Sequence, residues 1–123
     1  MNVKLADDPQ SRLIFACSGA SDVGHLTDRA ARALAREGVG RMYCLAGIGG
    51  RVESMLATTR AAKKVLVIDG CDQECARKTL QQGGFDRFLH LKLADLGFQK
   101  GKSTETPGDV NVITQEATDL LSD

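Results

Sequence analysis

Three short apolar runs, each followed by a segment with helical spacing of apolar residues, constrain the fold of this chain more than any other feature. The runs cover residues 13–17, 41–46 and 65–68. A continuous apolar run of this length is typical of a strand buried on both faces, as parallel strands are. The alternation of such strands with helices predicts βαβ units, and therefore a mostly parallel sheet with helices on both sides.

The helices are predicted from the spacing of apolar residues and from signals at their ends. Apolar residues recur at helical spacing over residues 22–37, 51–62, 72–82 and 109–121. Ser21 or Asp22 is expected to cap the first of these helices, and Asp72 the third, because short polar side chains accept the unpaired N–H groups of a first turn. Glycine follows the first helix at Gly38, a common way for a helix to end.

A fourth strand is expected at residues 88–93, where apolar and polar residues alternate. Alternation is typical of a strand near the edge of a sheet, and it predicts that His90 and Lys92 point outward, with His90 exposed. Residues 94–107 are polar and are expected to form a loop. We therefore expect a single α/β domain over residues 1–123, a three-layer, mostly parallel open sheet of about four strands with flanking helices, Rossmann-like or flavodoxin-like.

Composition narrows the classes of partner. Sixteen Lys and Arg residues are balanced by sixteen Asp and Glu residues, so the formal net charge is zero. Nucleic acid and anionic membranes both attract basic surfaces, and neither is expected as a partner. No apolar run approaches the roughly 20 residues that span a bilayer, and no apolar segment of a signal peptide follows Met1. We expect a cytoplasmic, reducing location, where cysteines more often bind metal or react than form disulfides.

The four cysteines are expected at one edge of the predicted sheet. Cys17, Cys44 and Cys71 follow one another at steps of 27 residues, each at or just beyond the carboxyl end of an expected strand, and Cys75 falls in the next helical turn. The carboxyl ends of parallel strands share the edge where open α/β sheets bind ligands. Four thiolates suit tetrahedral zinc, so the spacing predicts a zinc site. It equally allows unrelated buried thiols, above all at Cys44.

The segments that carry these cysteines resemble the three signatures of the DGC-domain family. They are CSGASDVG (residues 17–24), CLAGIGG (residues 44–50) and DGCDQECA (residues 69–76), in the order in which the family has them. The resemblance implies a small bacterial domain regarded as zinc-binding through four cysteines, here Cys17, Cys44, Cys71 and Cys75. It implies a metal site and no particular reaction.

Other chemistries at the same edge stay open. Cys71 and Cys75 are an alternative thiol redox pair, although redox pairs ordinarily have Cys-x-x-Cys spacing. An iron–sulfur cluster also suits four cysteines, but ferredoxin-like spacings are absent and zinc ranks first. In a zinc-dependent enzyme three thiolates would leave a position for water, with Asp69 or His25 as proton carrier. Asp69 is more simply expected to accept backbone N–H groups and fix the turn after its strand.

Overall fold

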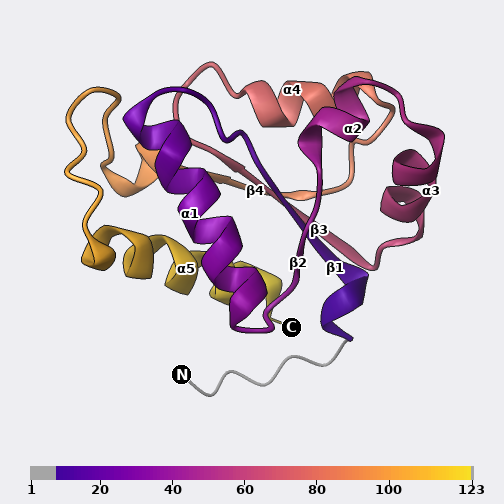
Figure 1. Cartoon of the computed structure of the whole chain (residues 1–123), viewed down its shortest axis with the longest axis horizontal. Coiled ribbons are helices and arrows are strands. Elements are labelled where there is room, and N and C mark those ends of the chain that lie inside the picture. Colours follow the sequence, from indigo (N-terminus) through magenta and orange to yellow (C-terminus); the bar gives the residue numbers. More distant parts are fainter. Residues whose placement is uncertain (1–7, 123) are drawn as a thin grey trace.

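The computed structural model describes residues 8–122, which form one parallel sheet with helices on both faces (Figure 1). The strands are β1 (Arg12–Ala16), β2 (Arg41–Met42), β3 (Lys64–Asp69) and β4 (Leu89–Lys92). The α-helices are α1 (Asp22–Arg36), α2 (Leu45–Gly49), α3 (Glu53–Ala61), α4 (Cys75–Gln82) and α5 (Pro107–Leu121), and the short 3-10 helices are η1 (Pro9–Ser11) and η2 (Leu93–Leu96). The expected α/β open sheet is confirmed.

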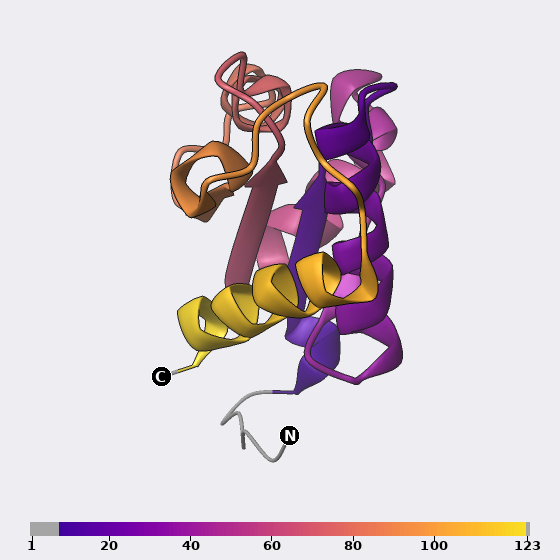
Figure 2. The ribbon, with the colours of Figure 1, turned by 90° about the vertical axis from the view of Figure 1, so that its left-hand side faces the viewer.

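The strand order within residues 8–122 is β2-β1-β3-β4, and the three strand pairs are all parallel. This is the order of the flavodoxin-like doubly wound folds. From β1 the chain moves to β2 on one side and then passes to β3 on the other, so the order reverses between β1 and β3. Figure 2 shows β1 and β3 pointing to the same end of the molecule, and the parallel pairing gives β2 and β4 the same direction. Ligands of doubly wound folds bind at the carboxyl ends of the strands that flank such a reversal.

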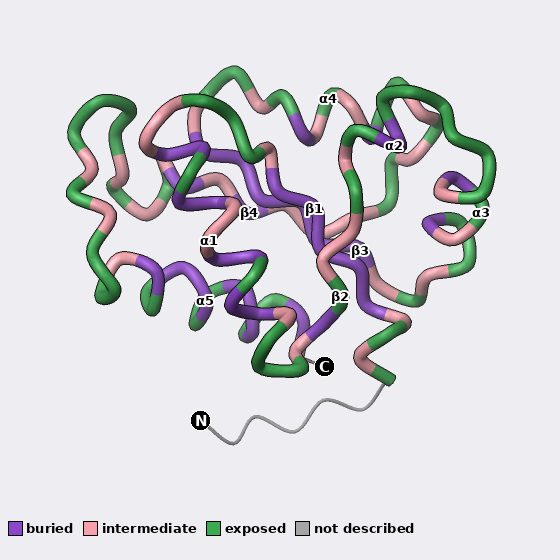
Figure 3. Tube along the Cα trace, viewed as in Figure 1, coloured by how far each residue is buried: buried purple, intermediate pink, exposed green. Residues whose placement is uncertain are grey.

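The core has two parts because the side chains of β1 alternate between the faces of the sheet. Leu13 and Phe15 pack with residues of α2, α3 and α4, whereas Ile14 and Ala16 pack with residues of α1 and α5. All five residues of β1 are buried (Figure 3). Both faces of the strand are therefore covered by helices, which explains its continuous apolar run.

The ends of the two longest helices carry the expected type of cap. The Ser21 hydroxyl accepts the Gly24 N–H at 3.1 Å, which confirms Ser21 as the cap of α1. At the start of α5 the Thr106 hydroxyl accepts the Asp109 N–H, and the Asp109 carboxylate accepts the Thr106 N–H. This reciprocal pair begins α5 at Pro107, two residues before the expected start.

The second apolar run differs most from expectation. The strand predicted over residues 41–46 ends at Met42, and α2, which was not predicted, begins at Leu45. Its buried Ile48 packs beside the sheet from a helix, because a short apolar run is buried equally well by either structure. Gly47 permits this packing, since a Cβ there would lie 1.9 Å from the Met55 Sδ.

The remaining boundaries shift by a few residues. The helix predicted over residues 51–62 covers Glu53–Ala61, and the helix predicted over residues 72–82 begins only at Cys75. β4 lies at the edge of the sheet, as its alternating pattern predicted. The expected loop after it begins with η2. No helix in the part of the chain described by the structure has the length and apolar character to cross a membrane.

Candidate functional site

Cys17 follows β1 directly, and the turn after it is fastened to α1. The Cys17 N–H donates to the Ile68 carbonyl at 3.0 Å, which continues the pairing with β3. Ser18 has a φ of +50°, and its N–H donates to the Thr27 hydroxyl at 3.1 Å. That hydroxyl donates its own proton to the Gly24 carbonyl at 2.7 Å. The Cys17 thiol, 3.4 Å from the same oxygen, is therefore the donor in its contact with Thr27.

Two glycines allow the backbone segments at this edge to approach each other. A Cβ on Gly24 would lie 2.7 Å from the Gly19 backbone, in the turn after Cys17. A Cβ on Gly70 would lie 2.8 Å from the Val23 carbonyl carbon, in the first turn of α1. Real Cβ atoms do not approach backbone this closely, so side chains at these positions would separate the segments that surround the cysteines.

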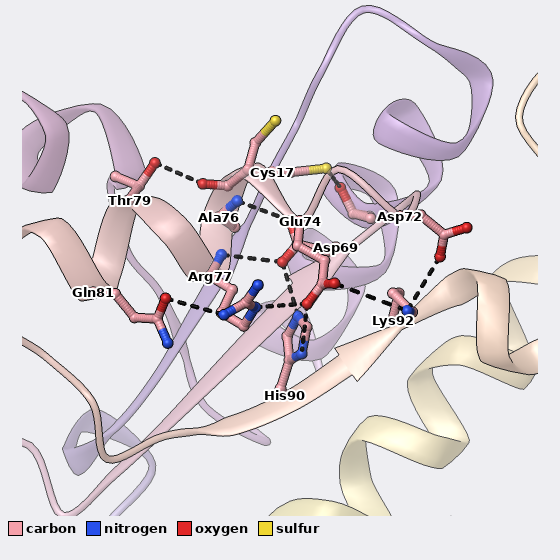
Figure 4. Close-up of polar contacts among 12 residues, drawn as sticks. Cys17, Asp69, Asp72, Glu74, Ala76, Arg77, Thr79, Gln81, His90 and Lys92 are labelled. Carbon is pink, nitrogen blue, oxygen red and sulfur yellow. Dashed lines mark hydrogen bonds and ion pairs between the residues drawn. The ribbon is translucent and has the colours of Figure 1, made fainter.

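Asp69, the last residue of β3, holds the first turn of α4 (Figure 4). Its Oδ1 accepts the Ala76 N–H at 2.8 Å, and its Oδ2 accepts the Arg77 N–H at 3.0 Å. The His90 Nε2 lies 2.8 Å from the same Oδ2, and it is the donor because a carboxylate only accepts. Asp69 is 1% exposed, and it makes all three contacts from within the core. The expectation that Asp69 accepts backbone N–H groups and fixes the turn is confirmed.

The linking segment (residues 70–74), between β3 and α4, also carries two acidic side chains that face basic ones (Figure 4). Lys92 Nζ lies 3.1 Å from Asp72 Oδ1 and 3.9 Å from Glu74 Oε2. Arg77 Nε donates to Glu74 Oε1 at 2.6 Å, and His90 Nδ1 lies 3.8 Å from that oxygen. The hydrogen bond from Arg77 holds the pKa of Glu74 below its ordinary value, and the hydrogen bond with Asp72 raises the pKa of Lys92.

Two expectations about these residues are wrong. His90 was expected to be exposed, but its side chain is only 22% exposed, because Asp69 of β3 and Glu74 of the linking segment lie against its ring. Asp72 was expected to cap its helix, but α4 begins three residues later, at Cys75, and the Asp72 carboxylate faces Lys92. Asp69 supplies the acceptors that a cap would have supplied.

The four cysteines line two neighbouring pockets that meet at Cys17. The thiol pocket, of about 420 Å³, is lined by Cys17, Cys71 and Cys75, together with Asp69 and Lys100 among others. The second pocket, of about 690 Å³, is lined by Cys17 and Cys44. All four are free thiols; Cys44 and Cys75 are exposed, and Cys17 and Cys71 are partly exposed. The structure thus brings Cys71 and Cys75 into one pocket with Cys17, and Cys44 into the other.

The donors at this edge suit a soft metal ion, although they are not gathered around one point. Thiolates are the ligands that Zn²⁺ takes in tetrahedral protein sites. Within residues 8–122, however, no group of three or more His, Cys, Asp or Glu side chains is close enough to hold a metal ion. In residue type the four cysteines fit zinc, and in position they share a surface rather than a ready-made coordination shell.

A long loop that the sequence did not connect with the cysteines contributes Lys100 to the thiol pocket. This outer loop (residues 97–106) is held against α1, as the orange segment of Figure 2 shows. The Asp22 carboxylate accepts the N–H groups of Gly101 at 2.8 Å and Ser103 at 2.9 Å, and these bonds lower the pKa of Asp22. The contact explains why Lys100, remote in sequence, lines the pocket.

His25, considered as a proton carrier, serves the outer loop instead. Its Nδ1 pairs with the Glu105 carboxylate, and its side chain is 61% exposed. Arg29, one helical turn further along α1, donates to the Glu105 carbonyl at 2.6 Å. His25 is not among the residues that line either cysteine pocket.

Comparison with known proteins places the chain among its relatives. A profile of the DGC domain family matches residues 13–117, which is most of the chain. The chain belongs to the DGC domain family. This DGC domain is also 36% identical over 94 residues to the anaerobic and virulence modulator AnvM of Pseudomonas aeruginosa, an alignment that covers 76% of this chain and 71% of AnvM. No solved structure matches the chain.

The Asp-Gly-Cys sequence of this DGC domain has a separate physical role at each position. Asp69 accepts the N–H groups of Ala76 and Arg77 in the first turn of α4. Gly70 lies so close to the backbone of α1 that a side chain would not fit. Cys71 then lines the thiol pocket. The three residues therefore connect the end of β3, the start of α4 and the pocket between them.

Proposed function

We propose that this DGC domain binds one thiophilic metal ion, Zn²⁺, through Cys17, Cys44, Cys71 and Cys75. The observation that carries the proposal is the position of Cys17, which lines both pockets and so shares a pocket with each of the other three cysteines. All four thiols are free and at least partly accessible, as metal ligands must be before they bind. The donor set is the all-thiolate set of structural zinc sites.

The proposed role of the metal is structural. Zinc held by four thiolates has no open position, and when bound it would cross-link the loops after β1, β2 and β3. Because metal binding and ordering of the ligand loops are linked, the shape of this edge would depend on metal supply and on the oxidation state of the thiols. Such dependence suits a modulator, which is the word in the name of the Pseudomonas relative.

Metal content and thiol accessibility test the proposal together. Protein purified without a histidine tag or chelator is expected to carry one zinc per chain by inductively coupled plasma mass spectrometry. Its thiols should react with a thiol reagent only after denaturation. No metal with four reactive thiols in the folded protein would contradict the proposal and would favour thiol redox chemistry at the same edge. Visible absorption of the purified protein would instead indicate an iron–sulfur cluster.

Single substitutions make the test specific to residues. Cys17→Ser should lose zinc most completely because Cys17 lines both pockets, and Cys71→Ser should lower zinc affinity and stability together. His25→Ala is the matched control, since His25 lines neither pocket, and it should retain one zinc per chain. Full zinc and unchanged stability in Cys71→Ser would exclude the four-thiolate site.

A further inference from the structure

We propose that Asp69 and His90 are positioning residues for the cysteine site: through the first turn of α4 they hold Cys71 and Cys75 in place. Neither residue is needed as a ligand. The inference rests on the proposed function for its effect on metal affinity, whereas its effect on the backbone is independent of any metal.

The start of α4 depends on Asp69 rather than on its own cap. Glu74, the residue in the cap position, has a left-handed backbone with φ of 55°, and its side chain accepts no N–H group of the helix. The second and third N–H groups of α4, those of Ala76 and Arg77, donate instead to the two oxygens of Asp69. Cys75 is the first residue of α4, so the carboxylate fixes the backbone on which Cys75 stands.

His90 in turn fixes Asp69. The carboxylate of Asp69 is 1% exposed, and a buried charge is tolerated only where it is well hydrogen-bonded. Its Oδ2 serves both the Arg77 N–H and the His90 ring, so removal of the ring takes away one of three donors. The other ring nitrogen of His90 faces Glu74 Oε1 at 3.8 Å. One side chain of β4 therefore contacts the residues at both ends of the loop that carries Cys71.

The start of α2, where Cys44 lies, lacks the side-chain support that Asp69 gives to the start of α4. Cys44 occupies the cap position of α2, but no side chain caps that helix, and the helix spans only Leu45–Gly49. Cys44 is exposed and lines the second pocket rather than the thiol pocket. The support supplied by Asp69 and His90 is thus directed to the Cys71 and Cys75 side of the site.

Loss of this support should weaken metal binding without removing any ligand. An unsupported loop must be ordered when the metal binds, and ordering a backbone opposes binding. Residues that orient metal ligands from behind typically contribute about 10- to 100-fold to metal affinity. We expect an effect of this size from His90, whose side chain is not part of the donor set.

The test compares His90→Leu, which removes the donor, with His90→Gln, whose amide can donate to Asp69, and with His25→Leu as the control histidine. In metal-free protein, the Ala76 and Arg77 amides should exchange with deuterium about tenfold faster or more in His90→Leu. The Gly24 amide, capped by Ser21, should be unchanged in all variants. His90→Gln should restore most of the protection, and His25→Leu should match the wild type.

The metal arm uses the same proteins. Zinc affinity, measured by competition with a chromophoric chelator, should fall about 10- to 100-fold in His90→Leu and recover in His90→Gln. The thiolate absorption of the Co²⁺-substituted protein should change in His90→Leu and match the wild type in the control variant.

Three results would overturn the inference. Unchanged exchange of the Ala76 and Arg77 amides in His90→Leu would show that His90 does not hold α4. Equal damage by Leu and Gln at position 90 would show that the hydrogen bond is irrelevant. Unchanged zinc affinity in His90→Leu would show that the cysteines need no positioning. If wild-type protein binds no zinc, the proposed function fails, while amide exchange still decides whether the two residues hold α4.

Asp69→Asn probes the same hydrogen bonds if His90→Leu does not fold. Asp69→Asn has the same shape as the wild-type residue and keeps one acceptor oxygen. It should leave one of the two amides, Ala76 or Arg77, protected and release the other. Protection of both amides at wild-type levels would contradict the role assigned to the carboxylate.

Discussion

Replacement of Asp69 by alanine should be among the most destabilising single changes in the described part of this chain. It removes the acceptor of two helix N–H groups and of the His90 ring at a site that is 1% exposed. Loss of one helix cap costs about 1 kcal/mol, and a hydrogen bond to a charged group contributes about 1.5–3 kcal/mol. Because Arg77 and His90 are only partly buried, water can replace some of these contacts. We expect a loss of about 3–5 kcal/mol, a large part of the roughly 5–15 kcal/mol that stabilises a domain.

Urea unfolding followed by far-ultraviolet circular dichroism would measure this loss. The chain has no tryptophan and one tyrosine, so backbone ellipticity is a better probe than fluorescence. Ser21→Ala is the matched control, because it removes one acceptor from the N-terminus of α1, that of the Gly24 N–H. It should cost about 1 kcal/mol. Asp69→Ala should exceed this control by about 2 kcal/mol or more, with Asp69→Asn between the two.

If Asp69→Ala costs no more than the loss of a single cap, then the carboxylate does not hold the first turn of α4. A loss of the expected size with an unchanged urea dependence of the unfolding free energy would support a local cause in the folded state.

Two further predictions concern the same edge. Gly70→Ala should destabilise the protein by about 1–3 kcal/mol in urea unfolding, because its Cβ would meet the Val23 backbone. Gly19→Ala should be nearly neutral, because a Cβ there has open space around it. Equal effects of the two substitutions would contradict the packing argument. Glu74→Gln should lower stability at neutral pH. The Arg77 hydrogen bond lowers the pKa of Glu74 in the folded protein, so its contribution is complete above the ordinary value of 4.5 and is lost as the pH falls through the folded pKa. The difference between wild type and variant should therefore shrink in acid, and a difference that grows below pH 4.5 would contradict the ion pair.

The elements that were predictable from the sequence are the strands whose apolar pattern fits only one environment, burial between two layers of helices. The run at residues 13–17 is apolar on both faces because β1 lies between two helical layers, and no other environment accounts for it as simply. The same applies to the run at residues 65–68, which lies within β3. These two strands position Cys17 and Cys71, so the edge at which the cysteines lie was predictable without coordinates.

The β2 region was not predictable because its pattern has two solutions. The run at residues 41–46 fits a buried strand or a buried helix, and the structure divides it between β2 and α2. The packing of Ile48 with α3 and α4 and the fit of Gly47 against Met55 distinguish the two, and both depend on residues remote from the run. Cys44 consequently lies at an exposed helix start rather than inside a strand.

The polar support of the cysteine site was also hidden in the sequence, although a signal for it existed. His90 and Lys92 alternate with leucines and therefore share one face of an edge strand, which by itself indicates a solvated face. Three acidic residues at positions 69, 72 and 74 offer partners of opposite sign for such a face. That charge pattern, considered together with β3 and β4 as neighbours, would have predicted that the two segments meet.

Equal spacing of the cysteines along the chain does not make their surroundings equal. Cys71 and Cys75 stand on a loop and a helix that Asp69 joins to β3 and that His90 joins to β4. Cys44 stands at the start of the five-residue helix α2, which follows β2 and has no capping side chain. A ligand that engages all four thiols therefore draws on one side that Asp69 and His90 hold and on another that no capping side chain holds. Stability of the metal-free fold should depend on the Asp69 side, and the additional stability conferred by a metal should come mainly from the side of Cys44.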